Sequence, residues 1–197
     1  MANEFKIQIL LNRISEKSDE LAFRELFNLF SNGLYRFSFS ILKNKELAEE
    51  VVSDVFFNIW VHRQGISKIE SFKPYLFTSA RNISLNYLQK EKRMKTIWME
   101  DVSVSLFIDE ICPESELIAE ELKMAIGRAI NNLPEKCKLI YSLAKIEQLK
   151  YKEIAKILDI SVKTIDNQLT IAFKKIGAEI QLYLDCDQAG EKLGLNL

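Results

Sequence analysis

Four polar side chains recur at helical spacing near the C-terminal end of the chain. They are Lys163, Asn167, Thr170 and Lys174. Residues three or four positions apart share one face of a helix, so a helix here would carry all four on a single stripe. Amide and hydroxyl groups hydrogen-bond the edges of bases, and ammonium groups pair with phosphates. The chemistry available to this stripe is therefore non-covalent recognition of DNA.

The segment that must position this stripe, residues 149–176, is predicted to be two short helices joined by a tight turn. In the first helix, Ile154, Ala155 and Leu158 are expected to form the apolar face. Ser161 follows the turn and is the expected N-cap of the second helix. The apolar stripe of the second helix, which should face the first, comprises Val162, Ile165, Leu169, Ala172 and Ile176. A helix-turn-helix enters the major groove in this form, but a plain helical hairpin shows the same pattern and remains an alternative.

Charge is unevenly distributed along the chain, although the formal net charge is only −1. Residues 81–95 hold five basic side chains and one acid, residues 96–121 hold eight acids and no base, and residues 138–176 hold eight lysines and four acids. This order predicts two nucleic-acid-facing parts separated by an acidic linker. Cations at the C-terminal end of a helix also complement its dipole, so the first basic cluster has a purely structural alternative.

The sequence lacks the patterns of catalytic or metal-binding sites. Its cysteines, Cys112, Cys137 and Cys186, are isolated and without CxxC spacing, and His62 is the only histidine. No glycine-rich phosphate loop or nucleophile motif is present, so we expect no enzyme, cofactor or metal. No run approaches the roughly 18 apolar residues of a membrane span, and the N-terminus does not resemble a signal sequence. A cytoplasmic protein with reduced thiols and no direct membrane insertion is expected.

Apolar periodicity predicts an all-α protein with two small helical domains. The first domain, residues 1–95, should contain helices over 5–30 with a break and cap at Ser18–Asp19, and then over 33–43, 46–61 and 72–92. Residues 62–71 show no periodicity and are expected to form a loop longer than usual, which favours a functional role. The phenylalanines concentrated before residue 78 predict an aromatic core.

The second half of the chain is predicted to begin with a linker. Residues 96–115 lose helical periodicity and are acidic, so we expect them to join the two domains. Helices over 116–131 and 135–145 should precede the hairpin and complete a second domain, residues 116–180. Residues 181–197 are expected to be a C-terminal tail, with no structure assigned.

These residues resemble a known family. Leu133-Pro134-Glu135-Lys136-Cys137, Tyr151-Lys152-Glu153-Ile154-Ala155 and Ile160-Ser161-Val162-Lys163-Thr164-Ile165 resemble region 4 of bacterial sigma factors. Ala48-Glu49-Glu50-Val51-Val52, Asp54-Val55-Phe56, Trp60, Phe72, Tyr75-Leu76-Phe77 and Ala80-Arg81-Asn82 resemble region 2. Both blocks in this order, with a short linker and no region 3, are similar to the extracytoplasmic-function group of the sigma-70 family.

The resemblance implies partners and site residues. In the family, the region 2.2 helix docks on the β′ clamp helices of core RNA polymerase, and region 4 meets the β flap. The implied core-polymerase contacts are Glu50, Ser53, Asp54 and Asn58. The loop 62–71 would capture a flipped base of the −10 element, and the implied −10 contacts are Ile66, Arg81, Asn82, Lys90, Lys92 and Arg93. The implied −35 contacts are Lys163, Thr164, Asn167, Gln168, Thr170 and Lys174.

Two departures from the family pattern concern these contacts. Ser53 stands where region 2.2 commonly has glutamine. The recognition helix carries Asp166, Asn167, Gln168 and Ile171 where relatives often carry arginine. Asn and Gln suit adenine and Asp can accept from cytosine, so the resemblance does not assign the −35 sequence that is read.

The resemblance predicts a promoter-recognition subunit of RNA polymerase that binds promoter DNA and, as is common in the group, an anti-sigma factor. A free-standing helix-turn-helix regulator would explain residues 149–176, but it would leave residues 5–95 and the acidic linker without a role. A helical interaction protein with no nucleic-acid role is a third hypothesis. Binding to core polymerase separates the first hypothesis from the other two.

Overall fold

The computed structural model describes residues 2–94 and 117–193. The chain divides into two compact units, Met1–Val104 and Ser105–Leu197, each of which is described by itself. All regular structure in the described ranges is helical. The predicted linker, residues 96–115, lies outside the described residues. None of the described helices is both long and apolar enough to cross a membrane.

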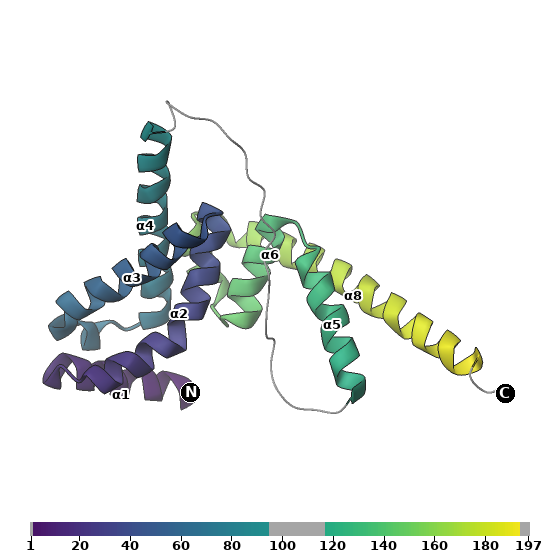
Figure 1. Cartoon of the computed structure of the whole chain (residues 1–197), viewed down its shortest axis with the longest axis horizontal. Coiled ribbons are helices and arrows are strands. Elements are labelled where there is room, and N and C mark those ends of the chain that lie inside the picture. Colours follow the sequence, from purple (N-terminus) through teal and green to yellow (C-terminus); the bar gives the residue numbers. More distant parts are fainter. Residues whose placement is uncertain (1, 95–116, 194–197) are drawn as a thin grey trace. The chain divides into compact units, whose positions relative to one another are not determined.

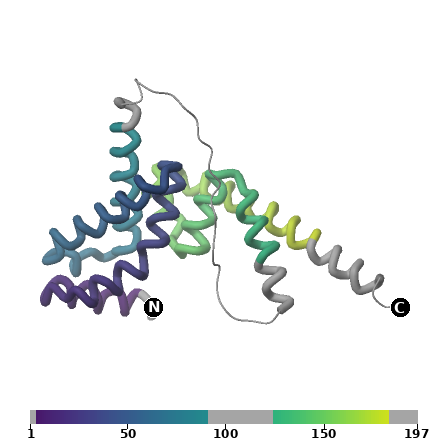
Figure 2. Tube along the Cα trace, in the orientation of Figure 1, coloured from purple at the N-terminus to yellow at the C-terminus, as the bar shows by residue number. Residues whose placement is uncertain are grey.

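Over residues 2–94, which the structure describes, unit 1 contains four α-helices and one short 3-10 helix, and Figure 1 shows how they are arranged. They are α1 (Ala2–Lys17), α2 (Glu20–Leu42), α3 (Lys45–Val61), the 3-10 helix η1 (Arg63–Lys68) and α4 (Phe72–Met94). Helices α2, α3 and α4 pack against one another, while α1 packs on α2 and on η1. The connections between them can be followed along the trace in Figure 2.

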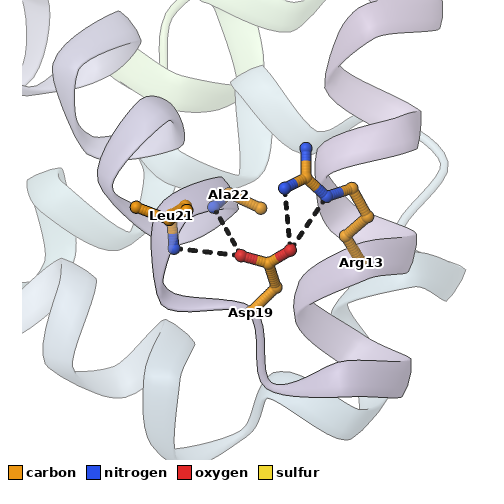
Figure 3. A network of polar contacts seen from close by, with 4 residues as sticks. All are labelled: Arg13, Asp19, Leu21 and Ala22. Carbon is orange, nitrogen blue, oxygen red and sulfur yellow. Dashed lines mark hydrogen bonds and ion pairs between the residues drawn. The ribbon is translucent and has the colours of Figure 1, made fainter.

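The predicted break and cap between the first two helices is confirmed. Asp19 Oδ1 accepts hydrogen bonds from the N–H groups of Leu21 and Ala22, each at 3.0 Å, which satisfies two donors at the start of α2 (Figure 3). Its Oδ2 accepts from Nε and Nη2 of Arg13 at 3.0 and 2.7 Å. The bond from the Ala22 N–H, followed by the bond from Arg13, lowers the pKa of Asp19 below its ordinary value. The Asp19 carboxylate therefore fixes both the start of α2 and its junction with α1.

The predicted separate helix over 33–43 is wrong, because α2 runs without a break through Gly33. A buried stripe of Leu26, Phe30, Leu34 and Phe37 continues across the glycine at spacings of three and four. Packing of this stripe outweighs the roughly 1 kcal/mol that a glycine costs inside a helix. The predicted aromatic core is confirmed. Its edge-to-face contacts include Phe37 with Phe77, whose ring centroids are 5.3 Å apart, and Phe30 with Phe72 at 6.0 Å.

Helix α3 begins where the Asn44 side chain accepts a hydrogen bond from the Leu47 N–H at 2.9 Å. Val51, Val55 and Ile59 form an inner ladder along α3 and are almost fully buried. Burying each such side chain is worth about 1.5–3 kcal/mol. The ladder thus holds α3 against the unit and directs the opposite face outwards.

Within residues 117–193, unit 2 contains four α-helices and one π-helical turn. They are α5 (Leu117–Asn131), α6 (Glu135–Tyr141), the π-helical turn η2 (Ser142–Ile146), α7 (Tyr151–Leu158) and α8 (Val162–Leu193). The helix expected over 135–145 therefore ends early and continues as η2. Helix α8 packs on α5, α6 and α7. It continues well past residue 180, into the segment for which the sequence assigned no structure (Figure 1).

The apolar face of the first hairpin helix differs from the prediction. Ile154 and Ile157 are the buried residues of α7, while Ala155 and Leu158 are half-buried. Because α7 contacts both α8 and η2, its inner face is rotated towards Ile157. In α8 the predicted stripe is buried from Ile165 onwards, but Val162, at the first position of the helix, is 42% exposed.

In the part of the chain that the structure describes, four residues other than glycine adopt left-handed backbone conformations at or beside the ends of helices. They are Ser18, Lys43, Gln148 and Asp159, with φ between 49° and 56°. Lys43 closes α2 and Asp159 closes α7, each with its N–H bonded to a carbonyl four residues back. Such residues turn the chain sharply enough for neighbouring helices to pack directly.

Candidate functional site

Three hydrogen bonds fix the turn between α7 and α8. The Ile160 N–H donates to the Ala155 carbonyl at 3.1 Å. Ser161 Oγ accepts from the Thr164 N–H at 3.0 Å, which confirms Ser161 as the N-cap of α8. The Thr164 hydroxyl lies 2.8 Å from Ser161 Oγ, so it belongs to the same cap. In this short turn, backbone groups at the end of α7 and at the start of α8 have hydrogen-bond partners. The turn therefore sets a defined angle between the helices, as a helix-turn-helix requires.

The outward face of α8 presents a continuous polar stripe. Lys163, Asn167, Thr170 and Lys174 are all exposed. Thr170 Oγ1 donates to the Asp166 carbonyl at 2.9 Å, which leaves its oxygen lone pairs for a ligand. The other two predicted −35 contacts, Thr164 and Gln168, are only partly exposed and lie at the edge of this stripe.

The inward face of α8 packs against α5, α6 and the turn between them in one hydrophobic cluster. The cluster contains Ala129, Ile130, Leu133, Cys137, Ala172 and Ile176. Within it, Cys137 Sγ donates to the Gln168 carbonyl at 3.1 Å. Burial raises the pKa of the Cys137 thiol, so the sulfur keeps the proton that this bond needs. The packing fixes the rotation of α8, and thereby the direction of its polar stripe.

A second candidate surface is the outer face of α3. Glu50, Ser53 and Asn58 are exposed on it, as predicted, and Asp54 is half-buried. The same face carries Phe57, which is 66% exposed. Covering the exposed side chain of a phenylalanine with an apolar partner surface lowers the free energy. Phe57 was not predicted as a site residue, although it follows Ser53 by four positions and so shares its face.

A shallow pocket adjoins this face. It has a volume of about 290 Å³ and is lined by Phe27, Ser31, Asn32, Tyr35, Glu49, Val52 and Ser53. Ser53 therefore belongs both to the outer face of α3 and to the wall of the pocket. Its hydroxyl donates to the Glu49 carbonyl at 3.0 Å.

The third candidate surface is the exposed face of α4. Tyr75, Thr78, Asn82, Asn86 and Gln89 are exposed at spacings of three and four. Such a stripe combines an aromatic ring, on which an unpaired base could stack, with side-chain amides that could hydrogen-bond its edge. Tyr75 and Asn86 were missed as site residues, although their spacing from Asn82 places them on its face.

Comparisons with known proteins match both units. A family model described as Sigma-70 region 2 matches residues 26–94, and one described as Sigma-70, region 4 matches residues 123–176. Together the two matches cover more than half of the chain. The chain belongs to the sigma-70 family. It is a sigma factor, and core RNA polymerase and promoter DNA are its partners.

Relatives place this sigma factor in the extracytoplasmic-function group. The ECF RNA polymerase sigma factor SigM of Bacillus subtilis is 29% identical over 154 residues, which cover 78% of this chain and 92% of SigM. The ECF RNA polymerase sigma-E factor of Escherichia coli is 25% identical over 188 residues, which cover 92% of this chain and 97% of the sigma-E factor. A solved structure of the sigma factor RpoE with the anti-sigma factor NepR, from Bartonella quintana, shares the fold, with a TM-score of 0.53 and 19% identity over 81% of this chain and 96% of that chain.

The residues expected to contact the −10 element have different structural settings in this sigma factor. Asn82 and Lys90 are exposed on α4, and Arg81 is half-buried. Lys92 and Arg93 lie in α4, but their side chains are outside the described set. Ile66 must be corrected, because its side chain is 2% exposed and belongs to the core of unit 1. An apolar residue here anchors η1, so it is not available for contact with a base.

Proposed function

We propose that this sigma factor directs promoter-specific initiation through three separate surfaces. The outer face of α3 binds the β′ clamp helices, the α4 face together with the segment 62–71 reads the −10 element, and the polar stripe of α8 reads the −35 element. The observation that carries the proposal is that one chain contains both sigma-70 regions, each with an exposed helical face of matching chemistry.

The polymerase surface combines charge with exposed apolar side chains. Phe57 shares the outer face of α3 with Glu50, Ser53, Asp54 and Asn58, and apolar anchors carry most of the binding energy of an interface. We propose that Phe57 is the central contact and that the acidic neighbours set orientation and association rate.

The −10 surface has the groups that recognition of single-stranded DNA needs. Unstacked bases are read by stacking and by amide hydrogen bonds, and phosphates by cations. We propose that Tyr75, Asn82 and Asn86 meet the bases. Phosphates would be contacted by Arg81, Lys90, Lys92 and Arg93.

The −35 surface is proposed to read bases in the major groove. Asn167 has the amide that pairs in bidentate fashion with adenine, and Gln168 is partly exposed beside it. Lys163 and Lys174 stand at the two ends of the stripe, where phosphates of the groove edges would pass. Thr164 acts mainly by capping α8 in this proposal, and Thr170 offers its oxygen as an acceptor.

Run-off transcription on genomic fragments with core polymerase tests the function. Initiation at discrete sites that depends on both the sigma factor and polymerase supports the proposal. Tight, sequence-specific promoter binding by the free protein, with no binding to polymerase, would instead establish a free-standing helix-turn-helix regulator.

We further propose that an anti-sigma factor is a partner and that the protein acts in the cytoplasm, where polymerase is found. The RpoE likeness supports only the shared fold, so the partner needs its own experiment. Affinity capture from cells with the whole chain as bait, followed by inhibition of transcription by the captured protein, tests this point.

A further inference from the structure

The 3-10 helix η1 is hydrogen-bonded to α1 through its backbone carbonyls. Gln8 Nε2 donates to the Ser67 carbonyl at 3.0 Å, and Ser15 Oγ donates to the Gln64 carbonyl at 2.9 Å. Ser67 Oγ lies 3.3 Å from Ser15 Oγ and donates to it. These contacts join residues that are about fifty or more positions apart in the sequence. Two side chains of α1 therefore hold both ends of η1.

Two residues of η1, Arg63 and Ile66, hold its start and its centre in place. Arg63 Nε donates to Ser18 Oγ at 2.8 Å, and Arg63 Nη1 donates to the Trp60 carbonyl at 2.9 Å. The Arg63 guanidinium also lies over the Trp60 ring, 4.9 Å from its centroid. Ile66 is buried in the core of the unit. The position of η1 is therefore fixed by Gln8 and Ser15 of α1, by Arg63 in its own first turn and by the buried side chain of Ile66.

Such support is physically required for η1. A 3-10 helix has poorer hydrogen-bond geometry than an α-helix, and runs longer than three or four residues are uncommon. The six residues Arg63–Lys68 exceed that length. The side chains of Gln64 and Lys68 remain exposed. The arrangement leaves two polar side chains displayed on a fixed backbone.

We infer that α1 preforms the base-reading segment of the −10 surface, with Gln8 and Ser15 as positioning residues that contact no DNA themselves. This inference rests on the proposed role of residues 62–71 in −10 recognition. A preformed segment loses less conformational entropy when it binds, and it discriminates among bases more sharply than a mobile one. Helix α1 lies before residue 26, where the region 2 match begins, so that match does not assign it this role.

The test uses the whole chain with core polymerase. Gln8→Ala removes the hydrogen bond to the Ser67 carbonyl. Ser15→Ala removes two hydrogen bonds, one to the Gln64 carbonyl and one from the Ser67 hydroxyl, and Ser15→Thr restores a hydroxyl. Asn12→Ala is the matched control, because Asn12 accepts the other bond of the Gln8 amide, at 3.1 Å, without touching η1. Lys6→Ala is a second control, because it removes the 2.7 Å ion pair to Glu25 and so loosens α1 from α2 alone.

Two readouts are compared across these variants. The first is hydrogen exchange at the amides of Gly65 and Ile69, which donate to the carbonyls of His62 and Ile66 within the segment. The second is transcription from promoters with each of the four bases at every −10 position. We expect Gln8→Ala to speed exchange and to reduce base discrimination by about two- to tenfold, the effect of one hydrogen bond, with polymerase binding unchanged. Ser15→Ala, which removes two bonds, should have at least this effect. Ser15→Thr, Asn12→Ala and Lys6→Ala should keep the wild-type preference.

The outcomes separate this inference from the proposed function. If the wild-type protein gives no polymerase-dependent transcription, the proposed function fails. If the wild-type protein discriminates among −10 bases and Ser15→Ala and Gln8→Ala discriminate equally well, the positioning role of α1 is refuted while the function stands. Equal losses in the Lys6→Ala control would also refute it, because they would trace to general loosening of α1.

Discussion

Tyr87 Oη donates a hydrogen bond to Asp54 Oδ2 at 3.0 Å and thereby joins α4 to α3. Asp54 stands on the face proposed for polymerase, and Tyr87 on the helix proposed for −10 DNA. This bond is one physical link between the two surfaces within unit 1. Asp54, predicted as a polymerase contact, thus also has a structural role.

Replacing Tyr87 by Phe should lower the free energy of unfolding by about 1 kcal/mol at neutral pH, the typical worth of one hydrogen bond. Burial, and then the bond to Asp54, raise the pKa of Tyr87 from 10.0 to about 12. Because the folded state favours the protonated phenol, this contribution is complete below pH 10.0 and is lost as the pH rises towards about 12. Urea unfolding of both proteins over this range measures it, and a pH-independent difference would contradict the assignment.

Phe57→Ala should weaken binding to core polymerase roughly tenfold or more while leaving the thermal unfolding midpoint nearly unchanged, because Phe57 is exposed in the free protein. Its neighbour Phe56 provides the matched control. Phe56 is 3% exposed, so Phe56→Ala should cost about 3–5 kcal/mol of stability. Binding titrations with labelled polymerase and thermal melts measure both effects. Unchanged binding by Phe57→Ala would remove Phe57 from the interface.

Asn167→Ala should reduce transcription from cognate promoters by removing a base-edge contact worth about 1–3 kcal/mol, and it should relax preference at one −35 position. Lys174→Ala should weaken binding evenly across sequences and reduce its salt dependence. Each variant controls for the other, because both residues are exposed on the same stripe. A −35 preference that survives Asn167→Ala would show that another face of α8 meets the groove.

Asp19→Asn should destabilise the protein at neutral pH, because it removes the negative charge that accepts two bonds from Arg13. The pKa of Asp19 is lowered from 3.8, so its contribution is complete above that pH and is lost as the pH falls through the lower folded-state pKa. The difference between variant and wild type should therefore shrink in acid. Denaturation midpoints measured from neutral pH downwards provide the check, and a difference that grows in acid would oppose this linkage.

Local signals predicted most helix starts and failed where packing decides. Asp19, Asn44 and Ser161 cap their helices as their residue types predict. The helix start predicted at Gly33 was wrong, because the low helix propensity of one residue is outweighed by a buried stripe that continues across it. The inner face of α7 could not be predicted from α7 alone, since its rotation depends on contacts with η2 as well as α8.

Site residues were predictable where helical spacing alone places a side chain outwards. The stripe from Lys163 to Lys174 is an example, and its exposure is as expected. Ile66 was not predictable in this way, because a segment without periodicity gives no sign of which side chain faces the core. The bonds from Gln8 and Ser15 were equally hidden, since they connect parts of the chain about fifty or more positions apart.

The left-handed residues at the helix ends imply that substitutions there can raise the free energy of unfolding of this chain. Glycine adopts this conformation without strain, whereas other residues lose about 1 kcal/mol, and natural proteins rarely sit at their stability optimum. Gln148, which precedes α7, lies outside the three proposed surfaces. Glycine at this position also loosens the unfolded chain, so the gain would be a fraction of that amount. Sturdier versions of this sigma factor should thus be reachable without altering what it recognises.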